Sequence, residues 1–367
     1  MKKILHIQVL PKLSGAQKVS LEILKKLPDC EYEKWILFSE SKEKCNWEEC
    51  AEEFRNIGVR VLFSKNLRRP IGWWDLPALV EIYKLCRNEK FDIVHTHSTK
   101  PGIVGRIGAK LAGVPLVIHT VHGLAFHKFI RFPKWQFYWV CEMFASFFCD
   151  KIVLVNRFYA RYFKWFRKKT TTIYNGLDFP TLYSAKIVPH LYPKMLFVGR
   201  LDKPKDPLTL LCAAKSVIAK YPEATFTLVG DGEKMEECEK YIRENHLIAN
   251  IRLAGWQSNV SAYYASHDIF VAPSIYEAFG LMFLEAGYYG LPVVATNVEG
   301  IPEVVVHNET GLLCAPLDVE ALAQNIGKLI EDVELRNAMG ENARKRVVHF
   351  FSSQRMVEQY IELYKTK

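Results

Sequence analysis

The sequence predicts an α/β protein with two doubly wound domains, each built on a parallel sheet. Short apolar runs rich in Val, Ile and Leu alternate with amphipathic stretches, and the whole pattern restarts near residue 195. Continuous apolar strands joined by helical crossovers are typical of a parallel sheet covered on both faces. The length of 367 residues suits two domains. Hydrophobic residues at 49% and charged residues at 24% exclude disordered, collagen-like and disulfide-scaffold proteins.

The expected elements divide the chain into four parts. Strands are expected at residues 4–9, 35–38, 59–63, 93–95, 116–119, 152–155 and 171–173, and then at 195–198, 225–229, 251–254, 269–272, 292–295 and 311–314. Helices are expected at residues 319–330, 334–350 and 354–364. The predicted parts are a first Rossmann-like domain at 1–180, a proline-containing hinge at 181–194, a second Rossmann-like domain at 195–350 and a C-terminal helix at 351–367. We expect this helix to cross back onto the first domain.

The composition also bears on location and on metal content. No apolar run reaches the roughly 20 residues that cross a bilayer, and the longest, at residues 137–149, contains Glu142. His6 and Gln8 interrupt the first apolar run, so a signal peptide is not expected. Nine cysteines without a C-x-x-C pair favour reduced thiols in the cytoplasm over a disulfide, zinc or iron–sulfur framework. The formal charge of +9 fits an anionic membrane surface, nucleotide phosphates or nucleic acid as partner.

Two glutamates follow the expected strand at residues 269–272. Glu277 and Glu285 flank Gly280, where a helix is expected to begin. In open α/β sheets, ligands bind at the carboxyl ends of strands, and a helix N-terminus there offers unpaired N–H groups to an anion. A solvated pair of glutamates on one helix face would show the same spacing, so the spacing alone leaves both interpretations open.

Basic residues and a glycine follow two other strands of the second domain. Arg200 and Lys205 come after the strand at residues 195–198, and Gly230 comes after the strand at 225–229. The bidentate arginine fork and the mobile lysine charge can together hold a diphosphate, and a glycine permits a tight turn close to a ligand. A solvated basic loop and an ordinary turn are the alternatives.

The first domain combines a glycine-containing loop with histidines at strand ends. Gly15 lies between the first strand and a helix, where α/β proteins often hold phosphate. The loop lacks the glycines of a dinucleotide fingerprint and the lysine-serine of a P-loop, so neither cofactor is expected. The histidines at strand ends are His95, His97, His119, His122 and His127. No carboxylate or cysteine accompanies them at ligand spacing, so we expect no metal, although one or two could donate hydrogen bonds to a substrate.

Together these motifs resemble the family four glycosyltransferases of the GT-B fold, of the type that builds bacterial envelope polysaccharides. The likeness spans residues 1 to about 350 and is carried by segments 14–16, 92–97, 119–123, 174–178, 199–205, 230–232, 277–285, 300–303 and 311–313. It implies two Rossmann-like domains that face each other across a cleft, the first binding the acceptor and the second binding a nucleotide sugar.

The resemblance implies a role for each matched residue. Arg200 and Lys205 would hold the diphosphate of the donor, Glu285 the ribose hydroxyls and Glu277 the donor sugar. The rest of the implied donor site consists of Gly15, Gly230, Phe279, Gly280 and Leu281.

His122 would lie near the reacting sugar, and His119 is the second candidate for that place. His122 and Glu277 are therefore the predicted catalytic residues, but Glu277 is not expected to act as a nucleophile. This sequence departs from the family pattern at three positions: Ser14 stands in place of the first of two glycines, Gln17 in place of a frequent glutamate, and Asp206 in place of the glycine that usually follows the lysine.

The resemblance also implies an activity. Members retain anomeric configuration without a bound metal, so the expected reaction moves a sugar from a nucleotide donor, expected to be a UDP-sugar, and forms an α linkage. The expected acceptor is a lipid-linked oligosaccharide or an envelope polysaccharide precursor. No cofactor is expected beyond the nucleotide sugar as co-substrate. A nucleotide-sugar epimerase of the same architecture and a basic protein that binds nucleic acid are the alternatives.

Three segments combine cations with aromatic residues, at 68–74, 126–148 and 157–169. As a single helix, residues 157–169 would place cations on one face and aromatic rings on the other. Such a helix fits an anionic membrane surface, and a helix with its rings in the domain core is the alternative. We expect a cytoplasmic enzyme held peripherally on the inner face of the cytoplasmic membrane.

Overall fold

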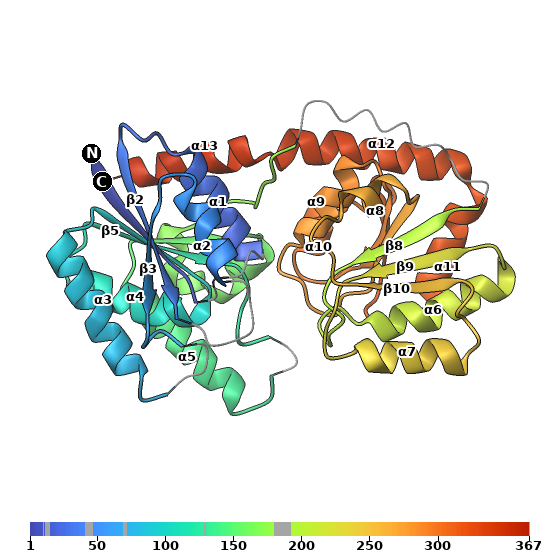
Figure 1. Cartoon of the computed structure of the whole chain (residues 1–367), viewed down its shortest axis with the longest axis horizontal. Helices are drawn as coiled ribbons and strands as arrows, with labels where there is room; N and C mark the ends of the chain where they lie inside the picture. The colour runs from blue at the N-terminus through green and yellow to red at the C-terminus, as the bar shows by residue number, and fades with distance from the viewer. Residues whose placement is uncertain are drawn as a thin grey trace. The chain divides into compact units, whose positions relative to one another are not determined.

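The computed structural model describes residues 1–9, 11, 15–40, 47–68, 72–127, 130–179 and 192–366. The chain forms two compact units, Met1–Asp178 together with Ser353–Lys367, and Phe179–Ser352 (Figure 1). The C-terminal helix therefore belongs to the first unit, as expected. Most of the predicted hinge, at residues 180–191, and also Ser14 and residues 69–71 lie outside the described residues. No helix among the described residues has both the length and the apolar character to cross a membrane.

The first unit contains a sheet of parallel strands in the order β3-β2-β1-β4-β5-β6-β7. The strands are β1 (Lys2–Ile7), β2 (Tyr32–Ser39), β3 (Arg60–Ser64), β4 (Ile93–His97), β5 (Leu116–Val121), β6 (Lys151–Leu154) and β7 (Thr170–Thr172). The chain builds one side of the sheet from β1 to β3 and then adds β4 on the other side of β1. Ligands of doubly wound sheets bind where the strand order reverses in this way.

Helices cover both faces of this sheet. They are α1 (Gly15–Lys26), α2 (Trp47–Arg55), α3 (Asp75–Glu89), α4 (Thr99–Leu111), α5 (Lys134–Ser146) and α13 (Ser353–Lys365). Helix α4 packs between α3 and α5, and α1 packs against α13 (Figure 1). Helix α13 is part of the core of this unit, to which it contributes Met356, Val357, Tyr360, Leu363 and Tyr364.

The second unit repeats this plan with the strand order β10-β9-β8-β11-β12-β13, again all parallel. Its strands are β8 (Lys194–Val198), β9 (Thr225–Val229), β10 (Ile251–Gly255), β11 (Ile269–Ala272), β12 (Val293–Thr296) and β13 (Gly311–Cys314). Its helices are α6 (Pro207–Lys220), α7 (Met235–Glu244), α8 (Ser261–Ala265), α9 (Leu281–Tyr288), α10 (Ile301–Val304), α11 (Val319–Glu331) and α12 (Val333–Phe350). Strand order reverses here between β8 and β11.

Every expected strand forms, with ends within about three residues of those predicted. The agreement follows from burial, because a strand covered on both faces needs an unbroken apolar run. Strands β5 and β11, for example, are buried along their whole length. The prediction of two doubly wound Rossmann-like domains is therefore confirmed.

Residues 157–169 differ from the predicted single amphipathic helix. They form two short 3₁₀ helices, η1 (Phe158–Tyr162) and η2 (Lys164–Lys169), with the non-helical Phe163 between them. Tyr159, Phe163 and Phe166 are buried in the first unit. The single helix assumed for this segment does not form, and the burial of these three rings fits the alternative in which rings of the segment lie in the domain core.

Candidate functional site

The loops that follow β8, β9 and β11 bring most of the predicted donor site together in the second unit. Strand β8 lies between β9 and β11 in the sheet, so the carboxyl ends of the three strands are neighbours. Arg200 and Lys205 follow β8, Gly230 follows β9, and Glu277 follows β11. This edge of the sheet is the point of strand-order reversal, the usual place for a ligand in a doubly wound fold.

Lys205 and Glu277 form an ion pair across two of these loops. The Lys205 Nζ donates to Glu277 Oε2, and it also lies 3.7 Å from the Met282 Sδ. Each of the two side chains is 14% exposed. The pair therefore places one ammonium and one carboxylate at the same spot, where they can receive a phosphate and a sugar hydroxyl respectively.

Arg200 is held by an acid that the sequence did not identify. Its guanidinium lies 2.9 Å from Asp202 Oδ2 and is otherwise largely exposed. The second carboxylate oxygen of Asp202 accepts a hydrogen bond from the Lys205 backbone N–H at 3.2 Å. Asp202 therefore fixes both basic residues of the loop. No spacing rule would have identified it, since its role depends on a turn that only the structure shows.

Glu285 is positioned by Tyr264, a second residue that the sequence did not reveal. The buried Tyr264 hydroxyl donates to Glu285 Oε2 at 2.8 Å. Burial and the neighbouring Glu285 carboxylate raise the pKa of Tyr264 well above its ordinary value, so the hydroxyl keeps its proton and remains a donor. Tyr264 lies in the short helix α8, which carries no recognisable motif.

Two glycines in these loops are required by geometry. Gly230 has φ of +140°, and a Cβ there would lie 1.8 Å from the Gly199 carbonyl oxygen. Gly280 precedes α9 in a left-handed conformation with φ of +80°. As a glycine, Gly280 supplies no side-chain cap to α9, and a helix start of this kind, next to Phe279 and Leu281, can offer backbone N–H groups to a ligand.

Asp206 occupies a backbone conformation that suits glycine. It has φ of +50° and ψ of +57°, just before α6, and the resemblance described above places a glycine here. A left-handed conformation is unfavourable for a residue with a Cβ. We therefore expect Asp206→Gly to raise the free energy of unfolding by about 0.5–1 kcal/mol, measured by urea denaturation. Asp206→Asn, which removes the charge and keeps the side chain, is the control; a loss of stability in Asp206→Gly would contradict the explanation.

The first unit contains the other two predicted site residues, Gly15 and His122. Gly15 begins α1, and a Cβ there would meet no described atom within 4 Å, so packing among the described residues does not require this glycine. His122 directly follows β5, and its Nε2 lies 3.0 Å from the His97 Nδ1. Burial lowers the pKa of His122 to about 4, which keeps the ring neutral.

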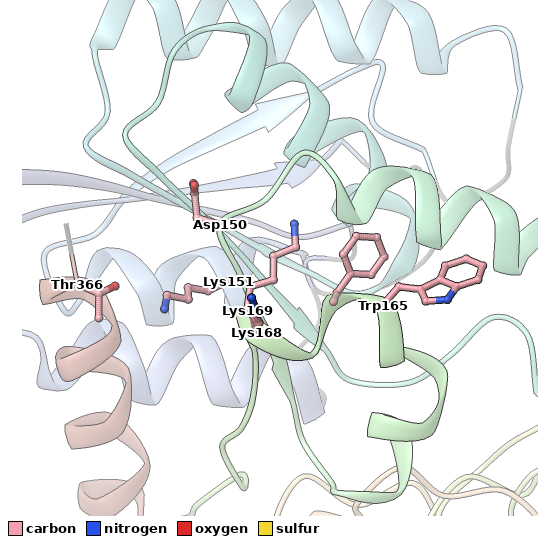
Figure 2. Close-up of a pocket in the computed structure, with 7 residues that line it drawn as sticks. Asp150, Lys151, Trp165, Lys168, Lys169 and Thr366 are labelled. Carbon is pink, nitrogen blue, oxygen red and sulfur yellow. The ribbon is translucent and has the colours of Figure 1, made fainter.

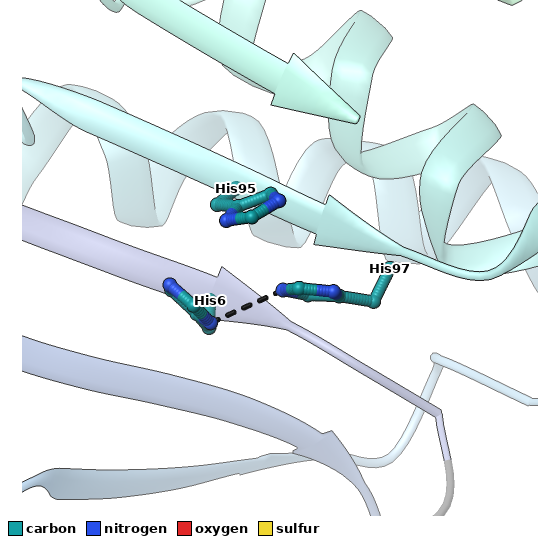
Figure 3. A group of neighbouring side chains, drawn as sticks. All are labelled: His6, His95 and His97. Carbon is teal, nitrogen blue, oxygen red and sulfur yellow. Dashed lines mark hydrogen bonds between the residues drawn. The ribbon is translucent and has the colours of Figure 1, made fainter. Parts of the chain in front are cut away.

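Three further histidines form a buried cluster beside His122 (Figure 3). The rings of His6, His95 and His97 come from β1 and β4, and His6 Nδ1 lies 3.1 Å from His97 Nε2. Their nitrogens approach closely enough to hold a metal ion. Each nitrogen of these three rings also lies within hydrogen-bonding distance of a neighbouring residue, however. Besides the contact between His6 and His97, the partners are Ser20, Thr120, Tyr364 and His122. The cluster is therefore satisfied as a hydrogen-bonded network.

His119, the second histidine candidate, belongs to a different buried group. It faces Thr96 at 2.9 Å and Glu142 at 3.6 Å. Glu142 Oε1 lies 2.8 Å from the Arg106 guanidinium, and both side chains are almost completely buried. This ion pair joins α4 to α5, so His119 contributes to the packing of the unit, and His122 alone of the two reaches the network described above.

The Arg106–Glu142 pair should contribute strongly to stability. Glu142→Gln leaves the buried Arg106 charge uncompensated, and we expect the free energy of unfolding to fall by about 3–5 kcal/mol, measured by urea denaturation of the full chain. The control is Glu341→Gln, which removes an exposed carboxylate from its pair with Lys345 and should leave stability almost unchanged. Equal small effects for the two variants would contradict the importance of the buried pair.

The first unit also has a shallow pocket of about 440 Å³ near the beginning of β6 (Figure 2). Asp150 and Lys151 line it at the start of β6, together with Trp165, Lys168 and Lys169. The Lys169 ammonium donates to the carbonyl oxygen of Cys149 at 2.8 Å. Lys169 therefore stabilises the chain after α5, and none of the predicted site residues lines this pocket.

Comparison with known families gives two matches that together span most of the chain. A model described as Glycosyltransferase Family 4 matches residues 13–179, and one described as Glycosyl transferases group 1 matches residues 184–346. The UDP-Gal:alpha-D-GlcNAc-diphosphoundecaprenol alpha-1,3-galactosyltransferase of Escherichia coli is 33% identical over 385 residues, which cover 99% of this chain and 96% of that protein. The capsular polysaccharide biosynthesis glycosyltransferase CapM of Staphylococcus aureus is 27% identical, with coverage of 99% and 97%.

Solved structures agree with this comparison at the level of the fold. Alr3699/HepE of Anabaena, crystallised with UDP and glucose, aligns over the whole of both chains with a TM-score of 0.84 and 21% identity. A glycosyltransferase of Rickettsia africae aligns over 99% of this chain and 98% of that one, with a TM-score of 0.81 and 22% identity. The shared fold is the GT-B arrangement of two Rossmann-like domains.

Proposed function

This chain belongs to the family 4 glycosyltransferases, and on that premise we propose that it moves a sugar from a UDP-sugar to a lipid-linked saccharide, with retention of configuration. The observation that carries the proposal is the meeting of Arg200, Lys205 and Glu277 at the carboxyl ends of β8 and β11. The E. coli relative is named for UDP-galactose as donor and for GlcNAc-diphosphoundecaprenol as acceptor. We take these two compounds as the first pair to assay.

In this proposal the second unit holds the donor. Arg200 and Lys205 bind the diphosphate, and Glu285, held by Tyr264, binds the ribose hydroxyls. Glu277 and the backbone of Phe279, Gly280 and Leu281 hold the sugar. The leaving diphosphate gains charge as the glycosidic bond breaks, and preorganised cations and backbone N–H groups stabilise such charge. The reaction therefore needs no metal under this proposal, and activity should persist in excess EDTA.

The donor site is tested by nucleotide binding. A ligand that binds only the folded state raises the thermal midpoint, so the midpoint is measured with UDP-, GDP-, ADP- and CMP-sugars in the absence of metal. We expect a rise with the UDP-sugars alone, and its loss in Glu285→Ala. The control is Glu244→Ala, which removes an exposed carboxylate of α7 in the same unit. An unchanged thermal midpoint with all of these compounds would contradict the assignment of the donor site.

We further propose that the first unit binds an anionic membrane through α5 and Trp165, on the inner face of the cytoplasmic membrane. The exposed residues Phe137, Val140, Phe144 and Phe147 recur at helical spacing along and just after α5. Trp165 is also exposed, and its ring lies 5.6 Å from that of Trp139 on α5. Lysines and arginines at 131, 134, 161, 164 and 168 adjoin it in the sequence. Aromatic rings next to cations suit the interface between headgroups and acyl chains.

Vesicle binding tests this membrane surface. We expect the protein to sediment with vesicles of phosphatidylglycerol at low salt, and Phe137→Ser/Phe144→Ser to reduce the bound fraction severalfold. Ile248→Ser, which removes a comparably exposed apolar side chain from the second unit, is the control. Full binding by the double variant would contradict the proposed surface, and no binding by the unmodified chain would favour a soluble acceptor.

The two alternative functions, a nucleotide-sugar epimerase and a basic protein that binds nucleic acid, gain no support. The relatives reported above are named as transferases, whereas an epimerase would consume its donor without an acceptor. A nucleic-acid-binding protein would have no use for the paired Lys205 and Glu277. Duplex DNA binding as tight as vesicle binding would restore that alternative.

A further inference from the structure

The buried histidines connect the C-terminal helix to His122 through an unbroken series of hydrogen bonds. From α13, the Tyr364 hydroxyl lies 2.7 Å from His95 Nδ1 and 3.3 Å from His6 Nε2. His6 Nδ1 lies 3.1 Å from His97 Nε2, and His97 Nδ1 lies 3.0 Å from His122 Nε2. All of these residues belong to the first unit. The series ends at His122. Among the described residues, none forms a hydrogen bond with the Nδ1 of this ring.

We propose that Tyr364 is a positioning residue that fixes which ring nitrogen of His122 carries the proton. The proposal rests on the proposed function in one respect, which is that His122 faces the substrate. A neutral imidazole has one N–H donor and one acceptor nitrogen, so the proton position on each ring constrains that on the next ring between Tyr364 and His122. Burial lowers the pKa of His6 to about 3 and that of His97 well below its ordinary value, so these rings are neutral.

The Tyr364 hydroxyl has one proton and two histidine neighbours. We assign the hydroxyl proton to the shorter contact, the one of 2.7 Å to His95 Nδ1, because a hydroxyl has a single proton to donate. The 3.3 Å contact is then donation from His6 Nε2 to the tyrosine oxygen. At the far side of His95, its Nε2 lies 2.7 Å from the Thr120 hydroxyl, which can accept the remaining N–H.

The donation from His6 to Tyr364 determines the rest of the series. With its proton on Nε2, His6 presents a lone pair at Nδ1, and the facing His97 Nε2 must then carry a proton. Ser20 lies 3.1 Å from both of these nitrogens and can donate to one and accept from the other. His97 Nδ1 is left as an acceptor, so His122 donates from Nε2 and keeps a lone pair on Nδ1. That nitrogen can accept a hydrogen bond from a sugar hydroxyl.

The tautomer of His122 is measured directly by long-range ¹H–¹⁵N correlation NMR of the full chain labelled with ¹⁵N-histidine, with His122 assigned from the spectrum of His122→Gln. We expect the Nε2–H form in the unmodified protein and a mixture of both forms in Tyr364→Phe. Tyr360→Phe is the matched control, because this equally buried tyrosine of α13 bonds, among the described residues, to Thr120 alone, at 3.1 Å, and lies outside the path from Tyr364 to His122. An unchanged His122 in Tyr364→Phe, or an equal change in Tyr360→Phe, would overturn the proposal.

A second variant tests the same proposal if Tyr364→Phe fails to fold. His6→Leu interrupts the same series one link closer to His122 and should give the same mixture of tautomers, and a single unchanged form would overturn the proposal. In the transfer assay, Tyr364→Phe should lower kcat about 10-fold without changing the KM for the donor, and Tyr360→Phe should retain kcat. A shifted tautomer with unchanged kcat would support the positioning by Tyr364 and contradict the role given to His122 under the proposed function.

Discussion

Lowering the pH from 7 to 5 should unfold the first unit before the second. Burial depresses the pKa of five histidines there, to about 3 for His6 and about 4 for His122, and well below the ordinary value for His95, His97 and His119. The unfolded chain binds protons at these rings below about pH 6.5 while the folded chain does not. The free energy of unfolding is therefore highest, with respect to these rings, above pH 6.5. It falls as the pH drops from 6.5 towards the pKa values of the folded state.

The expected size of this effect is large. Each ring contributes about 1.4 kcal/mol per pH unit in this range, so five together approach about 7 kcal/mol per pH unit, comparable with the whole stability of a domain. Hydrogen exchange of the intact chain, resolved by peptide, should show β4 and β5 losing protection near pH 5. Strands β11 and β12, which contain no histidine, serve as the internal control. Protection of β4 and β5 at pH 4.5 would contradict the prediction.

Lys205→Ala should lower the affinity for UDP about 100-fold. The ammonium is already held at the carboxyl edge of the second sheet by Glu277, and a cation fixed before binding loses little freedom when it meets the diphosphate. Charge-assisted contacts to phosphate are among the stronger ones in proteins. Isothermal titration with UDP measures the change. The same variant leaves Glu277 without its cation, which adds repulsion towards the incoming diphosphate.

Lys203→Ala is the matched control for this prediction. Lys203 lies in the same loop, carries the same charge and is exposed, so its removal should change UDP affinity less than threefold. Equal losses in the two variants would mean that the loop acts only through its overall charge. An unchanged affinity in Lys205→Ala would remove this residue from the donor site.

The fold was predictable because its signals are local. A strand buried on both faces must be an unbroken apolar run, and this is why strands such as β5 and β11 could be located from sequence. Residues 157–169 could not be assigned from the sequence, because their alternation of cations and rings is equally compatible with a helix on a membrane and with rings in the domain core. The structure buries Phe163 and Phe166 in the first unit.

The site was predictable only in part, for a related reason. Glu277, Glu285 and Lys205 stand out because they follow strands, and the carboxyl ends of strands form the binding edge. Asp202 and Tyr264 support these residues through single hydrogen bonds between loops, and no spacing in the sequence records such contacts. Tyr364 is the extreme case, since more than 260 residues separate it from its partner His95.

A single assay tests whether this chain transfers a sugar to a lipid-linked acceptor. The purified protein is incubated with UDP-galactose and α-GlcNAc-diphosphoundecaprenol in phosphatidylglycerol vesicles, and UDP release and lipid-linked product are measured together. We expect one α-linked disaccharide lipid for each UDP released, and almost no UDP release without the acceptor. UDP-galactose consumed at the same rate without the acceptor, or no reaction with any of a panel of UDP-sugars, would contradict this expectation.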